Sequence, residues 1–391
     1  MEIRRLTNIK LRLGESEEKL RETARRALKC NPAYFRIVKK SLDARDKGNI
    51  FYVYSIEFAA KEVAARGGAG AAESERLPEN KLPAENKPVL IVGAGPAGLF
   101  CALRLLKRGI TPLLIERGEA VEEREKTLKY FHETGDLNTE SNVSFGEGGA
   151  GTFSDGKLNT GTHVKENDEV LSEFVRFGAP EEIAYLNKPH IGSDKLKTVV
   201  KNMREHLLKH GTRVIFNACL TDIFIENGKI ARAEIARKDG NGRKTETIDV
   251  SAIVLAVGHS ARDTFELLRR KGVALTKKDF AVGVRIEHLQ SAIGFSQYGE
   301  KYKLLPPADY KCVFHGERAA FTFCMCPGGY VMAAASEESG VVTNGMSNYA
   351  RSGENANSAL IVQVTAADYP EDNPLAGMEF QRKIERAAYR L

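Results

Sequence analysis

The sequence predicts an α/β protein. A Rossmann-like, dinucleotide-binding domain carries a β-rich inserted domain and follows a small N-terminal α+β domain. Three observations lead to this fold class. Residues 88–116 read as strand, glycine-rich turn, helix and strand; residues 253–258 form a second apolar strand that ends on glycine; and alternating strands dominate residues 280–336.

The composition is typical of a globular protein of two or three domains. The 391 residues are 42% hydrophobic and 28% charged. No run approaches the ~18 apolar residues that a membrane span needs, and the N-terminal stretch lacks the apolar core of a signal peptide. Six scattered cysteines fit reduced thiols better than a disulfide framework. We therefore expect a cytoplasmic protein without a membrane span.

Residues 1–65 are expected to form a domain of β-α-β-β type. The expected elements are strands at 2–13, 34–41 and 50–58, a helix at 15–30 and a hairpin turn at 43–49. Residues 1–85 hold 18 Lys and Arg against 13 Asp and Glu, which is most of the net charge of +6. A solvated basic face and a surface for nucleic acid or an acidic partner both fit this excess.

A linker is predicted at residues 66–87, because Gly, Ala, Glu, Lys and Pro there leave almost nothing to bury. The dinucleotide motif follows at once. The apolar run 89–92 leads into Gly93-x-Gly95-x-x-Gly98 and a helix. Gly93 permits the tight turn, Gly95 lets the backbone approach a pyrophosphate, and Gly98 lets the helix pack close to the strand. The helix N-terminus, with Pro96 and Ala97, presents N–H groups to the phosphates.

Glu116 ends the second strand of this unit, 18 residues after Gly98. An acid at this place accepts hydrogen bonds from a ribose and argues against a 2′-phosphate. FAD or NAD is therefore favoured over NADP, and Arg117 is included among the candidate cofactor contacts.

The domain is expected to run from 88 to 190 and to resume at 249–275, with an insertion at 191–248. Beyond it, 276–391 is expected to be a β-rich substrate domain. The expected elements are helices at 119–133 and 195–210, strands at 212–216, 218–226 and 230–237 with a turn at Asn227-Gly228, and strands at 280–289, 312–326 and 329–336.

A second motif selects the cofactor. Residues 253–258, IVLAVG, form an apolar strand that ends on Gly258. This element resembles the strand that approaches FAD in flavoproteins with two dinucleotide folds, whereas NAD-dependent Rossmann dehydrogenases do not need it. The ordered pair of motifs therefore favours FAD over NAD.

The chain resembles a bacterial family of uncharacterised FAD-dependent dehydrogenases along nearly its whole length. The resemblance rests on GAGPAGLFCA, SFGEGGAGTFSDGKLNTG, NKPHIGSDKL, VGHSARDTFELL, FAVGVRIEH and FCMCPGGYV. It implies an FAD-binding domain and leaves the substrate open. Family members continue into a further segment near the flavin, so we expect this chain, which stops at FQRKIERAAYRL, to be truncated.

The glycine-rich segment 144–161 is a candidate flavin contact, because small residues bring backbone N–H groups close to the ring. Its candidate residues are Gly149, Gly151, Ser154, Asp155 and Lys157. A flexible glycine loop without a ligand is the alternative.

Cys324 and Cys326 lie two apart on an expected strand, so their side chains face the same way. Next to a flavin they are candidate catalytic residues that exchange electrons as dithiol and disulfide. Two buried structural thiols or a metal site are alternatives. Because no other Cys or His group has zinc-ligand spacing, no metal is predicted.

His259 follows Gly258 and is a candidate proton donor to flavin or substrate, although a helix-capping role fits equally well. Arg285 and Glu287 share a strand face that could line a substrate pocket or meet solvent. Arg351 is a candidate site for an anionic substrate, and His190 is interpreted as structural.

The leading hypothesis is an FAD-dependent oxidoreductase of unknown substrate that transfers hydride through flavin N5, with NAD(P)H as a candidate donor. The alternative is a flavin-dependent RNA-modifying or RNA-associated protein that uses the basic N-terminal domain. A regulatory FAD binder without turnover is a third hypothesis.

Overall fold

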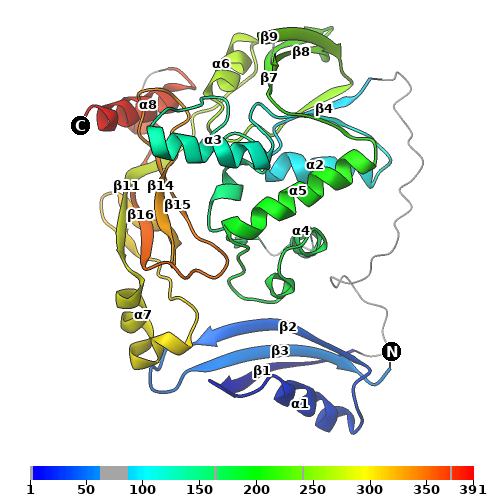
Figure 1. Ribbon diagram of the computed structural model, residues 1–391, viewed down its shortest axis with the longest axis vertical. Coiled ribbons are helices and arrows are strands. Elements are labelled where there is room, and N and C mark those ends of the chain that lie inside the picture. The colour runs from blue at the N-terminus through cyan, green and yellow to red at the C-terminus, as the bar shows by residue number, and fades with distance from the viewer. Residues whose placement is uncertain (1–2, 62–86, 163, 165, 240–241, 370–371) are drawn as a thin grey trace.

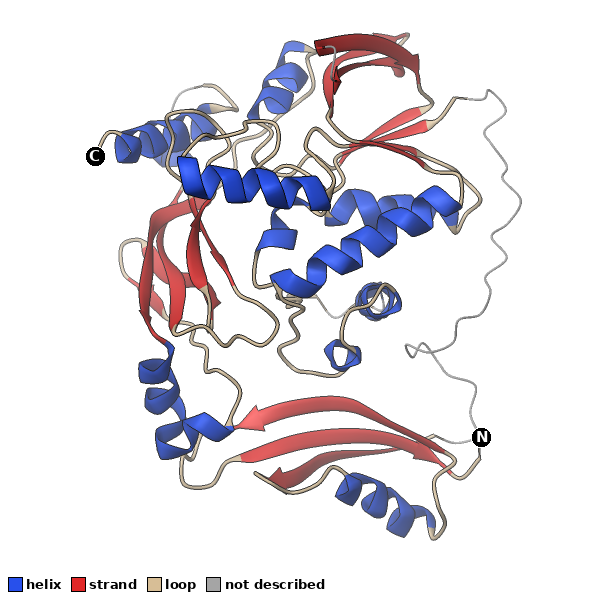
Figure 2. Ribbon diagram, viewed as in Figure 1, coloured by secondary structure: helices blue, strands red, loops and turns tan. Residues whose placement is uncertain are grey.

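The computed structural model describes residues 3–61, 87–162, 164, 166–239, 242–369 and 372–391. The expected linker at 66–87 therefore lies almost wholly outside the described residues. The N-terminal sheet occupies one end of the long axis and the β7–β9 sheet the other, with the parallel sheet and its helices between them (Figures 1 and 2). Among the described helices, none is long and apolar enough to cross a membrane.

The N-terminal domain is a three-stranded antiparallel sheet with one helix on one face. Its elements are β1 (Arg4–Arg12), α1 (Glu18–Leu28), β2 (Tyr34–Asp43) and β3 (Phe51–Ala59), with strand order β1-β3-β2. Leu20 and Ala24 of α1 are fully buried against Ile56 and Phe58 of β3, because their spacing of four puts them on one stripe of the helix. The domain joins the next one where the Lys40 N–H donates to the Tyr185 carbonyl and the Asn187 N–H to the Lys40 carbonyl.

A parallel four-stranded sheet forms the centre of the dinucleotide-binding domain. Its strands are β4 (Val89–Val92), β5 (Leu113–Ile115), β6 (Arg213–Ile215) and β10 (Ala252–Leu255), in the order β10-β4-β5-β6. The predicted Rossmann-like α/β fold class is confirmed. The expected division at residue 191 is wrong in one respect, because β6 pairs in register with β5 and belongs to this sheet.

Both faces of the parallel sheet are covered, as burial on two sides requires for parallel strands. One face, with Ile91 and Leu114, packs on α2 (Pro96–Leu106) and α5 (Ser193–Lys209). The opposite face, with Leu90 and Ile115, packs on the next sheet and on α6 (Arg262–Arg270). Two further helices flank this unit, α3 (Val121–Thr134) and α4 (Glu166–Arg176).

The covering sheet is antiparallel, with strands β7 (Ala218–Glu226), β8 (Lys229–Asp239) and β9 (Gly242–Asp249). Asn227 and Gly228 form the predicted turn between β7 and β8, both with positive φ (50° and 73°). β9 is a strand that the sequence analysis missed, because its outward residues are polar and exposed.

The β-rich domain contains a four-stranded antiparallel sheet in the order β11-β16-β13-β12. Its strands are β11 (Phe280–Leu289), β12 (Val313–His315), β13 (Ala319–Cys326) and β16 (Asn355–Val364). The single strand predicted at 312–326 is wrong: a turn at residues 316–318 divides it into the hairpin β12–β13. A smaller sheet of β14 (Tyr330–Ala333) and β15 (Thr343–Met346) and the helices α7 (Gln290–Tyr298) and α8 (Ala376–Tyr389) complete the domain.

Candidate FAD-binding site

A cavity of about 470 Å³ lies at the carboxyl ends of β4 and β10, beside the N-terminus of α2; we call it the nucleotide cavity. Ligands of open α/β sheets bind at this edge. The predicted cofactor residues that line it are Gly93, Gly95, Pro96, Ala97, Glu116, Arg117, Gly149 and Gly258, and His259 lines it too. The structure therefore brings together residues that lie as far as 166 positions apart in the sequence.

The three motif glycines have different surroundings. Gly93 has φ of +105°, and a side chain there would overlap the carbonyl of Ala256 on β10. A side chain at Gly98 would overlap the Gly93 carbonyl, so Gly98 is a packing residue that does not line the cavity. A Cβ at Gly95 would meet only the Gly149 Cα, at 3.9 Å, so this glycine faces open space.

Glu116 lies beside the nucleotide cavity, and three backbone N–H groups hold its carboxylate. Its Oε2 accepts from the Ala94 N–H at 2.7 Å, and its Oε1 accepts from the N–H groups of Gly118 at 3.0 Å and Gly146 at 2.9 Å. An ionised carboxylate has about four acceptor positions. One position thus remains for a ribose hydroxyl, while the other three join the ends of β4 and β5 to the glycine-rich segment.

Arg117 is fixed beside the same cavity by a dense set of contacts. Its guanidinium pairs with Asp263 and with Glu140 at 3.3 Å, and it stacks on the Phe145 ring at 4.6 Å. It also donates to Cys219 Sγ at 2.8 Å. These partners leave Arg117 as a rigid planar surface rather than a free cation.

A second cavity, of about 580 Å³, lies between the parallel-sheet domain and the β-rich domain; we call it the inner cavity. The two cavities share four lining residues, Ser144, Ala150, His259 and Ser260, so they form one elongated cleft. The inner cavity is further lined by β11 and by α8. A long two-part ligand fits this shape better than a compact one does.

His259 stands where the two cavities meet. Its Nδ1 lies 3.1 Å from Ser260 Oγ, and Ser260 Oγ in turn donates to Ser144 Oγ at 3.3 Å. Ser260 and Ser144 thus connect the His259 imidazole to the glycine-rich segment at the junction of the two cavities.

Arg124 of α3 is the largest fully buried side chain near the site, and the sequence analysis missed it. It donates to three backbone carbonyls, those of Asn142 at 2.9 Å, Val143 at 2.9 Å and Glu147 at 2.7 Å. Burial lowers its pKa to about 10, while Glu116 and Glu147 oppose that shift. Arg124 therefore holds the segment 142–147 against the nucleotide cavity.

Ser154, Asp155 and Lys157 have other partners than the expected flavin contacts, and they do not line either cavity. Ser154 closes a local turn by donating to the Gly151 carbonyl at 2.8 Å. Asp155, 1% exposed, forms a bidentate ion pair with Arg351 and lies 2.7 Å from Lys157 Nζ. The predicted flavin contacts of Ser154, Asp155 and Lys157 are therefore revised to contacts within the protein. Arg351, the candidate site for an anionic substrate, is already paired with Asp155. Gly151, too, does not line either cavity; like Ser154, it belongs to the turn.

His190 lies in a partly buried environment, which agrees with the structural role assigned to it from the sequence. Its Nε2 lies 2.9 Å from the Tyr349 carbonyl, its ring stacks on Tyr349, and burial lowers its pKa to about 4. Arg285 lines the inner cavity and donates to Asn357 Oδ1 at 2.7 Å. Glu287 on the same strand is exposed and does not line the inner cavity.

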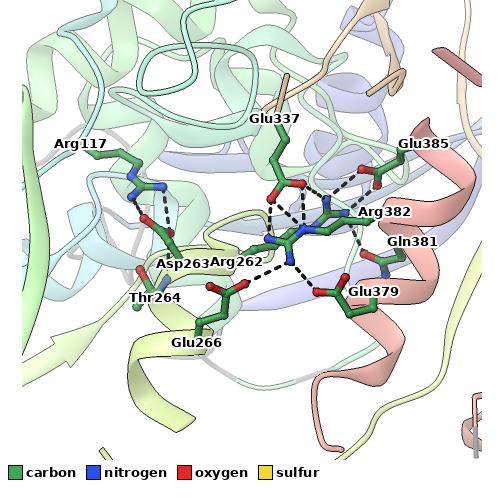
Figure 3. A network of polar contacts seen from close by, with 10 residues as sticks. All are labelled: Arg117, Arg262, Asp263, Thr264, Glu266, Glu337, Glu379, Gln381, Arg382 and Glu385. Carbon is green, nitrogen blue, oxygen red and sulfur yellow. Dashed lines mark hydrogen bonds and ion pairs between the residues drawn. The ribbon is translucent and has the colours of Figure 1, made fainter. Parts of the chain in front are cut away.

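An ion-pair network holds α8 beside the inner cavity (Figure 3). Arg262 of α6 pairs with Glu337 at 2.8 Å and with Glu385 of α8 at 2.7 Å. Arg382 of α8 pairs with Glu337 at 2.8 Å and with Glu266 of α6 at 3.1 Å. The network thus joins α6, the loop after β14 and α8.

Within the described residues, no group of three or more His, Cys, Asp or Glu side chains could hold a metal ion.

Three segments of the chain match known families. Residues 86–134 match the family described as FAD binding domain, and residues 279–391 match FAD-dependent protein, C-terminal domain-like. Residues 3–59 match a domain of unknown function (DUF8436). Over 369 residues the chain is 44% identical to an uncharacterized protein of Clostridium beijerinckii, with 91% of this chain and 68% of the relative covered. The chain belongs to this family of FAD-dependent proteins.

Membership in the FAD-dependent family confirms the resemblance found in the sequence and the assignment as an FAD-binding flavoprotein. Among solved structures, the chain is 14% identical to a geranylgeranyl bacteriochlorophyll reductase-like protein of Thermoplasma acidophilum, with a TM-score of 0.34. That match covers 76% of this chain and 61% of the other. THI4 of Thermovibrio ammonificans is 20% identical, with a TM-score of 0.33 and 49% and 66% covered. The chain thus spans about two thirds of the length of these proteins, from 61% to 68%.

Proposed function

We propose that this FAD-dependent protein binds FAD along the two joined cavities and acts as an oxidoreductase. The ADP half would occupy the nucleotide cavity and the flavin the inner cavity. The observation that carries the proposal is the elongated cleft, which begins at the motif glycines and continues past His259. When bound, FAD supplies hydride transfer at its N5 atom.

The residues of the nucleotide cavity fit the ADP half of FAD. The open space at Gly95 and the N-terminus of α2 suit a pyrophosphate, because the first N–H groups of a helix have no partner within the helix. The free acceptor position on Glu116 suits a ribose hydroxyl. The guanidinium plane of Arg117 offers a flat surface at the adenosine side.

Two groups at the inner cavity support a reaction there. The His259 imidazole at the junction can hold a proton that enters or leaves the reacting end of the cleft. Arg285, on β11, suits a substrate with an anionic group. Residues of the helix α8 form part of the wall of the cavity.

NADH or NADPH is the electron donor that we propose to test first. The RNA alternative is not favoured, because neither of the matched families with a described role concerns RNA. The basic N-terminal domain is therefore not part of the proposal.

A visible absorption spectrum tests the proposal, recorded on this chain and on the Clostridium beijerinckii relative after incubation with FAD and removal of unbound flavin. We expect yellow protein that releases FAD on heating, and anaerobic bleaching by NADH or NADPH. If neither protein retains flavin, the proposal is wrong. Retention without bleaching by any donor would favour a regulatory FAD binder.

A further inference from the structure

Cys324 and Cys326 lie at an irregularity of β13 next to the inner cavity. The register passes from Phe323 opposite Ala359 to Cys326 opposite Asn357, so β13 has one extra residue at this point. Cys324 has a positive φ of 47°, which a residue with a side chain rarely adopts. Cys326 Sγ lies 3.3 Å from the Cys324 carbonyl oxygen, which places the second thiol against the first residue.

The two thiols differ in exposure. Cys326 is fully buried, whereas Cys324 is half-buried and reachable from solvent. A pair with one accessible and one inaccessible sulfur has the asymmetry of an attacking and a resolving thiol, since only the first can meet a substrate.

Two cationic side chains from different segments, Arg285 and Lys157, lie near the pair. Arg285 Nη1 of β11 lies 3.4 Å from the Cys324 carbonyl, and Asn357 of β16 contacts the same guanidinium. Lys157 comes from the glycine-rich segment, where it pairs with Asp155. Asp155 also forms an ion pair with Arg351, which largely neutralises its negative charge.

These surroundings lower the pKa of the Cys324 thiol. The adjacent Cys326 side chain is the largest cause, and the positive charges of Lys157 and Arg285 add to it, against burial and Asp155. The same contact and burial raise the pKa of Cys326 far above its usual range. Cys324 is thus the thiolate and Cys326 the protonated partner.

We propose that Cys324 and Cys326 form a redox-active dithiol that reduces small disulfides. The Cys324 thiolate attacks a disulfide RSSR, forms a Cys324–S–S–R bond and releases one thiolate, RS⁻. Cys326 then loses its proton and attacks Cys324 Sγ, which expels the second RS⁻. The pair ends as an intramolecular disulfide, RSSR has gained two electrons, and one of the two released thiolates takes up the proton that Cys326 lost.

The return of the pair to its dithiol form rests on the proposed function. Two electrons and one proton must come back, and reduced FAD in the inner cavity is the donor class that the proposed function offers. Arg285 connects the inner cavity with the cysteine pair, because it lines that cavity and contacts the Cys324 carbonyl. The forward half-reaction needs no flavin, so it can be tested apart from FAD binding.

The test uses the full chain, freed of flavin, in a background where the exposed Cys30 and Cys312 are replaced by Ser. The protein is treated with the aromatic disulfide 5,5′-dithiobis(2-nitrobenzoate) and digested, and the cysteine peptides are read by mass spectrometry. We expect a Cys324–Cys326 disulfide without a retained aryl group. With Cys326→Ser the aryl group should stay on Cys324, and with Cys324→Ser residue 326 should remain unmodified.

Two results would overturn the proposal: a mixed disulfide that persists on Cys324 while Cys326 is present, or reaction at Cys324 no faster than at Cys101 and Cys219. The pH profile of Cys324 alkylation by iodoacetamide is the second readout. Its midpoint should lie clearly below that of an ordinary thiol and move upward by at least half a unit in Lys157→Met and in Arg285→Met. Lys271→Met, which removes an ion pair with Asp222 of β7 on the far side of the parallel sheet, is the control and should leave the midpoint in place. A midpoint between 8 and 9 in the unaltered chain, where an ordinary thiol titrates, would also contradict the proposal.

Discussion

Replacement of Gly95 by Ala separates FAD binding from folding. Gly95 has φ of −72° and ψ of −178°, a conformation that alanine adopts without strain. The new Cβ would meet only the Gly149 Cα at 3.9 Å within the protein. The methyl group would instead occupy the open side of the turn, where the pyrophosphate is proposed to lie.

The expected loss follows from the contacts that the methyl group would displace. A phosphate pushed away from the turn loses about two charge-assisted hydrogen bonds, worth roughly 1.5–3 kcal/mol each. FAD affinity should therefore fall by about 3–6 kcal/mol, or roughly 10²- to 10⁴-fold. The free energy of unfolding without FAD should change by less than about 0.5 kcal/mol.

Quenching of FAD fluorescence on titration with protein gives the affinity, and urea unfolding gives the stability. Gly98→Ala is the matched control, since its Cβ would overlap the Gly93 carbonyl and must disturb the fold as well. If Gly95→Ala binds FAD within threefold of the unaltered chain, the pyrophosphate does not lie at this turn and the placement of FAD is refuted.

Three further outcomes are expected. Arg124→Met should lower the free energy of unfolding, measured in urea, by about 3 kcal/mol. Three hydrogen bonds of ~2 kcal/mol each are lost, while the cost of burying the cation, about 3 kcal/mol, is removed. An unchanged free energy of unfolding would mean that the three carbonyls find other hydrogen-bond donors. Glu116→Gln should weaken FAD binding and cost about 2–4 kcal/mol in the same assay, since one amide oxygen cannot serve three N–H groups. His190 and His206 both have their pKa lowered to about 4, mainly by burial. The unfolded chain therefore binds more protons between pH 6.5 and 4, and stability should fall as the pH is lowered through that window. Replacing either histidine by Gln should flatten the fall by roughly 1–2 kcal/mol at pH 5.

Local signals predicted much of the fold. The turn at Asn227-Gly228 and the glycine motif after β4 depend on backbone conformations that few residue types allow, so the residues themselves reveal the structure. The helices α1 and α5 were predictable for a related reason, because apolar residues recur along one stripe of each.

Pairings between distant segments could not be predicted in this way. β6 pairs with β5 across about a hundred residues, with Leu113 opposite Arg213, and β16 inserts between β11 and β13. Nothing local encodes a partner so remote. Arg124 was missed for the same reason: within a charged helix it reads as a surface residue, and only the segment 142–147 folded over it makes it buried.

The attachment of α8 differs along its length, and this gives the inner cavity an ionic-strength dependence. The first turns pack on an apolar cluster with Val364 and Tyr369, whereas the later turns are held by Arg262 and Glu337. Salt screens these pairs only in part, because Arg262 and Arg382 are largely buried while Glu337 and Glu266 are partly exposed, and it leaves apolar packing intact. Added salt should therefore weaken the attachment of the second half of the helix more than that of the first. Access to the inner cavity would then respond to the ionic composition of the solution, whereas the nucleotide cavity, which no residue of α8 lines, would not.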